Sequence, residues 1–293
     1  MKITNELNLP QALVDACDVS PHNAPNTISA TTLKNSIREI LLTKRHWEEM
    51  EDDVSNRIWT LFGSAVHALL EKEAPDTFVE ERFEKQISKY KVTGKLDCYD
   101  MKQKIIFDYK TASTWKFKFN DYSDWRFQGL IYAWLLKQNG LEVDECRFVM
   151  MFKDFSKTKA KTDPDYPQKP VFVYSFKVTE KDLEEIEEKI ADKIVELEEA
   201  EKLSDDELPM CTDEERWYRG GKFAVMKKGR KTAIKLFDDK DNAQKYINAV
   251  GGDLYIEERK GTDGKCEGYC GCCQFCSYWK EHYSISKNEV EIE

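Results

Sequence analysis

The chain has 293 residues, 41% of them apolar, and a formal net charge of −10. This length suffices for one large domain or for a domain with an appendage, and the composition is typical of a soluble globular protein. No apolar run approaches the roughly 20 residues of a membrane helix, and the first residues lack the basic start and apolar core of a signal peptide, so we expect a cytoplasmic protein.

The negative charge is concentrated in one segment. Residues 178–208 contain fourteen acidic residues and four lysines, which by themselves account for a net charge of −10. The rest of the chain is therefore close to neutral and has basic stretches of its own. The net charge does not exclude a polyanionic partner such as DNA.

The first part of the chain predicts a lead-in followed by two helices. Residues 1–28 read as a loosely structured lead-in, and a helix with a serine or threonine cap is expected from Ser29. A second helix is expected over about residues 54–73. Its apolar stripe consists of Ile58, Leu61, Phe62, Ala65, Val66, Leu69 and Leu70.

The middle of the chain predicts strands and helices in alternation. Thr179 and Asp182 have the spacing of a capping box that opens a long amphipathic helix. Before it the pattern indicates strands at 78–87, 90–99 and 104–111, a helix at 124–140, a buried strand at 145–155, a polar loop at 156–170 and a strand at 171–178. This order predicts an α/β fold with a mixed central sheet flanked by helices.

The last part of the chain differs in composition. Residues 217–260 predict a hairpin that turns at Lys228-Gly229, a short helix and a strand, and a cysteine cluster follows. The predicted domains are the lead-in at 1–28, an α/β core at 29–208, and a small α+β insert with a cysteine-rich metal-binding lobe at 209–293.

Two aspartates lie in predicted strands, where aspartate is disfavoured. Side-chain alternation places Asp108 and Lys110 on one face, and the hairpin brings Asp97 beside Asp108. Adjacent carboxylates repel each other unless a cation lies between them, and oxygen ligands suit Mg²⁺ or Mn²⁺. The alternative is that both acids belong to surface turns.

Four further polar residues have suggestive positions. Gln128 and Tyr132 share a helix face, and Gly63 lies one turn before His67, where it leaves space beside the imidazole. Glu81 lies on the apolar face of its strand, which is unusual for an unpaired acid. Taken singly, His67 and Tyr132 also fit a structural place in the core.

Taken in order, these residues form four motifs that resemble the PD-(D/E)XK nuclease superfamily. The similar branch is that of the RecB/AddB-like exonucleases, and phage-encoded members in particular, over about residues 29–280. The motifs are G-x-x-x-H at 63–67, G-x-x-D at 94–97, D-Y-K at 108–110 and Q-x-x-x-Y at 128–132. The resemblance implies a restriction-endonuclease-like core and a metal-dependent DNA exonuclease. It also implies work in phage recombination, replication or repair, with phage or host recombination proteins as partners.

The resemblance also implies roles for the matching residues. His67, Asp97, Asp108 and the carbonyl of Tyr109 would bind Mg²⁺ or Mn²⁺. Lys110 would orient or activate the attacking water and offset the charge of the phosphate.

Other matches carry less specific roles. Gln128 and Tyr132 would position the lysine and the DNA, and Glu81 is a weaker match. The acid usual at position 109 in the superfamily is replaced by Tyr109, as is common in this branch, so its carbonyl would take that acid's place.

The cysteines indicate a second metal site. Clustered thiols in a reducing cytosol are more often metal ligands than disulfides. Exonucleases of the similar branch often hold a [4Fe–4S] cluster with one upstream cysteine and three near the C-terminus. Cys17 is a weaker upstream candidate because it lies in the lead-in. The set that resembles this pattern is Cys211, Cys266, Cys270 and Cys276, with Cys272 and Cys273 between.

The cysteine pattern departs from the family in two respects and leaves alternatives open. The upstream cysteine follows the core instead of preceding it, and the first C-terminal gap is three residues. Four thiolates also suit Zn²⁺, and spacing does not separate the two metals. Free thiols are the remaining alternative.

Basic and aromatic residues suggest DNA contacts. Phosphates would be natural partners of the predicted hairpin tip, although a solvated turn has the same composition. Trp115, Phe119 and Trp125 either stack on an unpaired base or belong to the core. The lysines of 156–170 are weaker candidates. The tip residues are Lys227, Lys228, Arg230 and Lys231.

Two other functions remain compatible with these residues. A structure-specific or nicking endonuclease would have the same motifs. A non-catalytic DNA-binding protein on a nuclease fold would not need the aspartates and the lysine together.

Overall fold

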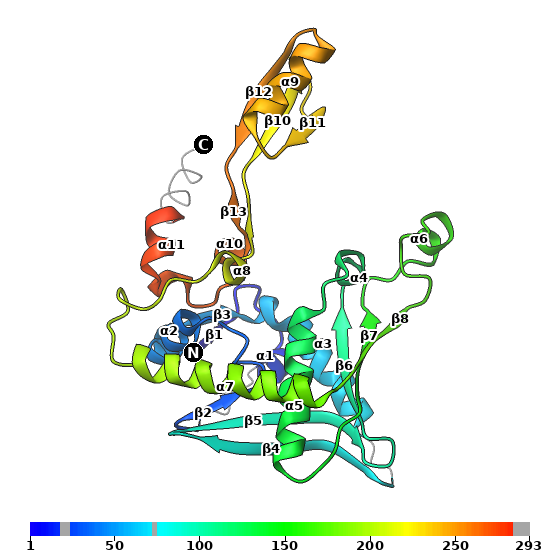
Figure 1. Ribbon diagram of the computed structural model, residues 1–293, viewed down its shortest axis with the longest axis vertical. Helices are drawn as coiled ribbons and strands as arrows, with labels where there is room; N and C mark the ends of the chain where they lie inside the picture. Colours follow the sequence, from blue (N-terminus) through cyan, green and yellow to red (C-terminus); the bar gives the residue numbers. More distant parts are fainter. Residues whose placement is uncertain (18–23, 72–74, 284–293) are drawn as a thin grey trace. The chain divides into compact units, whose positions relative to one another are not determined.

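The computed structural model describes residues 1–17, 24–71 and 75–283 (Figure 1). The chain divides into two compact units. The first, here called the sheet unit, comprises residues 1–35 and 47–202. The second, the cysteine unit, comprises residues 36–46 and 203–293, of which the structure describes those up to 283.

A six-stranded sheet forms the centre of the sheet unit. Its order is β2-β5-β6-β7-β8, and β4 also pairs with β5. The pairs β6–β7 and β2–β5 are parallel and the others are antiparallel, so the sheet is mixed, as predicted. The strands are β2 (Thr27–Ser29), β4 (Thr77–Ile87), β5 (Tyr90–Asp100), β6 (Ile105–Ala112), β7 (Glu145–Phe152) and β8 (Val171–Lys177).

Two long helices cover part of this sheet. Helix α5 (Ser123–Gln138) packs against α7 (Glu180–Ala200) and against β4 and β5 (Figure 1). The capping box of Thr179 and Asp182 forms as predicted. The apolar face of α7 is buried, because the four-residue spacing of its isoleucines and leucines keeps them on one side.

The core lies between α5 and the central strands. Trp134 and Leu135 of α5 and Phe148 of β7 are fully buried. Gly129 lets the helix approach, since a Cβ at that position would lie 3.0 Å from the Phe148 and Phe176 rings. This close packing fixes the position of α5 against the strands, and the polar residues of α5 are positioned with it.

The predicted lead-in contains regular structure, and the predicted polar loop at 156–170 contains a short helix, α6. β1 pairs in parallel with β3, because Asp53 accepts hydrogen bonds from Thr4 Oγ1 and Glu6 N. The prediction of a loosely structured lead-in was therefore wrong for the part described; residues 18–23 lie outside it. The further elements of this unit are β1 (Lys2–Thr4), α1 (Gln11–Cys17), η1 (Trp47–Glu49), β3 (Glu51–Asp53), α3 (Val54–Leu70), α4 (Thr114–Phe119) and α6 (Lys157–Thr162).

The predicted apolar stripe of helix α3 is not buried in the core. Of its residues only Val54 is buried, and Phe62 and Leu69 of the predicted stripe are exposed. The side that approaches the sheet contains Gly63, whose Cβ position is 3.3 Å from Thr111 Oγ1. A close approach through glycine leaves the large apolar side chains on the outside.

The helix expected from Ser29 begins later. Residues 30–36 form turns, in which the Ser29 hydroxyl lies 2.8 Å from that of Thr32. Helix α2 (Ile37–Arg45) then starts behind Ser36, whose side chain accepts from Glu39 N. Serine and threonine side chains that hydrogen-bond locally favour turns over a helix interior.

The cysteine unit combines α2 with the C-terminal part of the chain. A three-stranded antiparallel sheet of order β11-β10-β12 packs with α9, and β13 pairs with β9. Its elements are α2, α8 (Asp213–Arg216), β9 (Tyr218–Arg219), β10 (Lys222–Lys227), β11 (Lys235–Phe237), α9 (Lys240–Val250), β12 (Leu254–Arg259), β13 (Thr262–Asp263), α10 (Gly264–Gly268), η2 (Cys273–Phe275) and α11 (Ser277–His282).

Helix α2 belongs to this unit because of one buried arginine. Arg38 is 2% exposed and donates to the carbonyl oxygens of Leu208 and Pro209 at 2.5 and 3.1 Å. The predicted core at 29–208 thus differs from the observed division, which assigns 36–46 and 203–208 to the cysteine unit. Across the described residues, no helix has the length and apolar character that a membrane crossing requires.

Candidate active site

The hairpin of β5 and β6 brings the two strand aspartates together. The pairing of β5 with β6 runs from Asp100–Ile105 to Cys98–Phe107 and ends just before Asp97 and Asp108. Asp97 Oδ2 accepts a hydrogen bond from Tyr109 N at 2.7 Å. A carboxylate held by a backbone amide has a fixed orientation, so the strands position both acids rigidly.

Asp108 is a buried carboxylate with an incomplete set of partners. It is 2% exposed, and burial raises its pKa to about 6, while the nearby Lys110 ammonium acts in the opposite direction. Asp108 Oδ1 lies 2.7 Å from Lys110 Nζ, yet it accepts no hydrogen bond of normal geometry. A buried carboxylate oxygen whose partner is a single ammonium is a group that a bound cation would also satisfy.

Gln128 of α5 connects the remaining predicted residues. Its Nε2 donates to Tyr132 Oη at 2.7 Å and reaches Asp108 Oδ2 at 3.4 Å. Its Oε1 accepts from Lys110 Nζ at 3.4 Å. The amide thus holds the lysine and the buried acid in one network, and Tyr132 holds the amide.

Close packing of α5 on β5 explains why the second motif begins with a glycine, Gly94. A Cβ at this position would lie 2.7 Å from Leu135 Cδ1 and 2.8 Å from Tyr132 Cδ1. Tyr132 therefore packs directly on the β5 backbone. The motifs at 94–97 and 128–132 form one packed unit.

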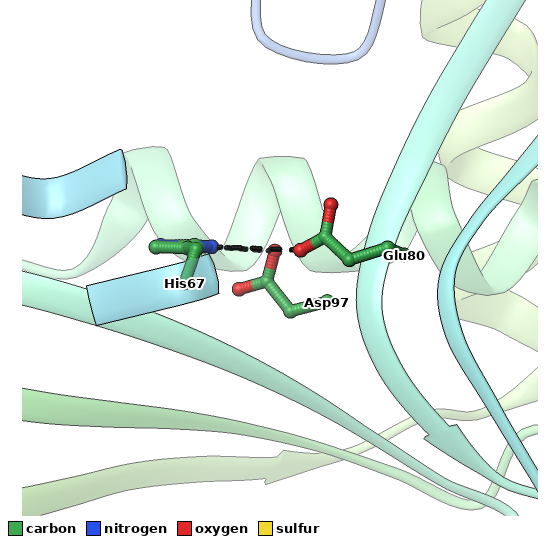
Figure 2. Close-up of side chains that lie close together, drawn as sticks. All are labelled: His67, Glu80 and Asp97. Atoms are coloured by element: carbon green, nitrogen blue, oxygen red, sulfur yellow. Dashed lines mark ion pairs between the residues drawn. The ribbon is translucent and has the colours of Figure 1, made fainter. Parts of the chain in front are cut away.

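His67 lies with two carboxylates. Its Nδ1 is 3.2 Å from Asp97 Oδ1 and 3.8 Å from Glu80 Oε1, and Figure 2 shows both acids directed toward the imidazole. One ligand atom from each of the three residues lies within 4.8 Å of the others. Hydrogen bonding to Asp97 raises the pKa of His67, against the effect of its burial. Gly63 faces Thr111 and not the imidazole, so the space predicted there has another use.

Glu80 was missed by the sequence reasoning, which singled out Glu81. The register of β4 with β5 runs on both sides of Glu80 and places it across from Asp97, while Glu81 is exposed. The tight turn at residues 88–89 could have identified Glu80 from the sequence. Ile87 pairs with Tyr90 across this turn, and that pairing sets the strand register and hence the face on which each acid lies. Glu80 has a φ of 54°, a left-handed conformation that non-glycine residues rarely adopt outside special sites.

These donors suit a hard divalent cation. The carboxylates of Glu80 and Asp97 and the His67 imidazole suit Mg²⁺ or Mn²⁺, with the imidazole favouring Mn²⁺. The predicted ligand Asp108 is not part of this group of three among the described residues. Glu80 also forms an ion pair with Lys95, which reduces the charge that the metal-free site must hold. The residues present therefore fit the predicted metal.

The cysteine unit gathers the predicted thiols around one pocket. Arg38 Nη1 lies 3.6 Å from Cys276 Sγ, and Ser36 Oγ lies 3.2 Å from Cys211 Sγ. The pocket is lined by Cys211, Cys266, Cys270, Cys272, Cys273 and Cys276. Cys17 belongs to the sheet unit, where it is buried at the end of α1.

Four of these thiols influence one another electrostatically. Burial raises the pKa of Cys266 to about 12, and Cys211, Cys270 and Cys276 add to this shift. Burial also raises the pKa of Cys211, with contributions from Cys276 and Cys270. A hydrogen bond from Cys272, 3.6 Å away, lowers the pKa of Cys270 to about 7. The four predicted cysteines thus line one pocket, and a metal held by them would require loss of thiol protons.

The predicted basic tip is an exposed hairpin. The chain turns at Lys228-Gly229, as predicted, and Gly229 has a φ of 82°. Lys227, Lys228, Arg230 and Lys231 are all exposed. The tip belongs to the cysteine unit, whereas the aspartates belong to the sheet unit.

Two aspartates and a lysine lie on adjacent strands of a mixed sheet, and a glutamine of α5 contacts the lysine. This arrangement is typical of a nuclease-type α/β core. The chain belongs to the PD-(D/E)XK nuclease superfamily, whose sequence model matches residues 20–215. The predicted superfamily is thereby confirmed. No curated protein matches the chain.

Several solved structures are similar to parts of the chain. A protein designated SSO0001 has a TM-score of 0.45 at 18% identity, over 62% of this chain and 83% of its own. An alkaline exonuclease from Laribacter hongkongensis has a TM-score of 0.36 at 12% identity, over 59% and 89%. A phage-related exonuclease from Haemophilus somnus 129PT has a TM-score of 0.31 at 12% identity, over 66% and 83%.

Proposed function

We propose that this protein is a Mg²⁺- or Mn²⁺-dependent DNA exonuclease of the RecB/AddB-like branch. The observation that carries the proposal is the buried Asp108 carboxylate, which forms an ion pair with Lys110 and is influenced electrostatically by Asp97 and His67. A protein that only binds DNA has no need for a buried, poorly satisfied acid next to a lysine. Such strain is retained where it serves chemistry.

The proposed roles follow from the contacts. His67, Glu80, Asp97, Asp108 and the Tyr109 carbonyl hold the cation. When bound, the cation lowers the pKa of water and screens the phosphate. Lys110 orients the attacking water and offsets the charge of the phosphate.

Two residues of α5 support that lysine. Gln128 fixes the position of Lys110 through its Oε1, and Tyr132 fixes Gln128. Both would act on the lysine, and a direct contact with DNA is the further part of their proposed role.

Hydrolysis of end-labelled linear DNA and closed circular DNA tests the proposal. Each is incubated with Mg²⁺, Mn²⁺ or EDTA, using the wild type and the variants Asp108→Ala and Lys110→Ala. Lys104→Ala, an exposed lysine of the same hairpin, is the matched control. We expect metal-dependent loss of linear DNA that either site variant abolishes and the control retains.

Other outcomes distinguish the rival functions. Cutting of the closed circle would replace the exonuclease with an endonuclease. DNA binding without cleavage under every condition would replace the enzyme with a binding protein.

We also propose that the four cysteines hold a [4Fe–4S] cluster, with Zn²⁺ as the alternative. In the part of the chain that is described, no three cysteine sulfurs come within 4.8 Å of one another. A tetrahedral zinc site with Zn–S bonds of about 2.3 Å needs sulfurs about 3.8 Å apart. The Cys270 and Cys272 sulfurs lie 3.6 Å apart, so the spacing leaves zinc open, and four thiolate ligands suit either group.

Absorbance and metal content of anaerobically purified protein test the cluster. We expect about four irons per chain, in line with the proposed cluster, and loss of the iron in Cys276→Ser. Cys98→Ser, in the sheet unit, serves as the control. One zinc per chain without visible absorbance would contradict the cluster.

The basic hairpin tip is the second proposed DNA-binding surface. Lys227, Lys228, Arg230 and Lys231 would bind backbone phosphates without regard to sequence. Phage DNA recombination, replication or repair in the cytoplasm, with phage or host partner proteins, is the setting that the proposed branch suggests.

A further inference from the structure

Two pairs of exposed aromatic side chains lie on the sheet unit. Trp59 and Phe62 of α3 pack edge to face, and Trp115 and Phe119 of α4 stack. Their exposed fractions are 58%, 47%, 58% and 65% in that order. Of the two alternatives left open by the sequence, a place in the core therefore does not apply to Trp115 and Phe119, whereas Trp125 is buried.

Both pairs lie near the end of β6, just beyond Lys110. Helix α3 touches β6 through Gly63 and Thr111, and α4 begins at Thr114 where β6 has ended (Figure 1). Lys153, which touches Trp59, donates its backbone N–H to the Ala112 carbonyl. At about 3.3 Å per strand residue, Thr114 is roughly 13 Å from Lys110 along the chain. Such a distance spans only a few nucleotides.

A lysine accompanies each aromatic pair. Lys153 Nζ lies 4.1 Å from the Trp59 ring centroid, and Lys118 Nζ lies 5.1 Å from that of Trp115. Neither lysine has an ion-pair partner among the described residues. The nearest acid in sequence, Asp154, accepts instead from Ser113 Oγ and Thr114 N. Each pair thus offers a ring surface together with an uncompensated positive charge.

We propose that these two aromatic–lysine pairs form a platform on which unpaired bases at a DNA end stack. Ring faces bind bases without regard to sequence, and the lysines bind the phosphates between them. The substrate class is therefore DNA with a single-stranded or frayed end, and this rests on the proposed action on DNA. A protein partner would need a carboxylate opposite each lysine, and it would give no preference for strands that carry bases.

Oligonucleotides that lack bases separate stacking from charge attraction. A fluorescent 12-residue thymidine oligonucleotide and the same backbone with abasic sites are titrated into Asp108→Ala protein, which prevents cleavage. We expect the intact oligonucleotide to bind at least about fivefold more tightly than the abasic one, since one stacked base contributes that much or more. Adding Trp59→Ala or Trp115→Ala should remove most of this preference.

Three controls keep the outcome interpretable. Trp217→Ala, at a tryptophan of the cysteine unit that is 50% exposed, should retain the preference. Trp59→Phe and Trp115→Phe should restore it, which a merely structural loss would not allow. Unfolding curves confirm that each variant is folded.

The results also separate this inference from the proposed nuclease. Equal binding of intact and abasic strands, or an unchanged preference in both alanine variants, overturns the platform even where the wild type degrades DNA. If the wild type prefers intact strands but never cleaves DNA, the stacking platform is supported and the proposed nuclease activity is wrong.

Discussion

At the scale of single residues, the buried carboxylate of Asp108 lowers the stability of the folded protein at neutral pH. Burial raises its folded pKa to about 6, above the ordinary value of 3.8. The stabilising contribution of the protonated acid is complete below the ordinary pKa and is lost as the pH rises through about 6. This rise in the pKa corresponds to a free energy on the order of a few kcal/mol.

Asp108→Asn should therefore stabilise the metal-free protein at pH 7.5, by up to about 3 kcal/mol, and have little effect near pH 4. Urea unfolding in EDTA at both pH values measures this. Asp100→Asn, on the same hairpin, is the control, because hydrogen bonds from Gln103 lower the Asp100 pKa. A destabilised Asp108→Asn protein at pH 7.5 would show that Lys110 compensates the buried charge.

Glu80 and Glu81 form a natural matched pair. Glu80→Gln removes a carboxylate that faces His67 and Asp97, whereas Glu81→Gln changes an exposed side chain. We expect Mn²⁺ affinity to fall about tenfold or more, or roughly 1.4 kcal/mol, only in the first variant. Isothermal titration of Mn²⁺ measures it, and equal affinities in the two variants would remove Glu80 from the site.

At the scale of elements, the contact of β5 with α5 couples stability to the site. Gly94→Ala inserts a Cβ against Leu135 and Tyr132, and overpacking of this kind costs about 1–3 kcal/mol. Displacement of Tyr132 would also release Gln128 and Lys110.

We therefore expect Gly94→Ala to lower both the free energy of unfolding and the rate of DNA hydrolysis. Urea unfolding and a cleavage assay measure the two effects on the same preparation. Gly220→Ala is the control, because its Cβ would meet no atom within 4 Å. Normal cleavage by a destabilised Gly94→Ala protein would separate the packing from the chemistry.

At the scale of the whole molecule, the two units should respond separately to disruption of the proposed cysteine metal site. The thiols, Arg38 and the carbonyls that it binds all belong to the cysteine unit. The sheet unit has its own buried core around Trp134 and Phe148.

Cys211→Ser should therefore expose residues 203–283 to proteolysis while residues 75–202 stay protected. Limited proteolysis followed by mass spectrometry identifies the cut sites. Cys98→Ser should give the wild-type pattern. Simultaneous digestion of both units would indicate that the sheet unit depends on the metal for its folding.

The sequence predicted the mixed sheet, and it predicted which residues of the candidate site share a face, for identifiable reasons. Strand alternation fixed the shared face of Asp108 and Lys110, and the four-residue spacing fixed that of Gln128 and Tyr132. These are local periodicities, which need no knowledge of the tertiary fold. Their roles in catalysis stay predictions until the variants are measured.

The tertiary structure decided what depended on contacts between distant segments. Glu80 joins the site because the pairing of β4 with β5 selects its face, and α2 joins the cysteine unit because the partners of Arg38 lie about 170 residues away. The outward face of α3 depends on the approach of Gly63 to Thr111. Periodicity states which side chains share a face, and only packing decides what that face meets.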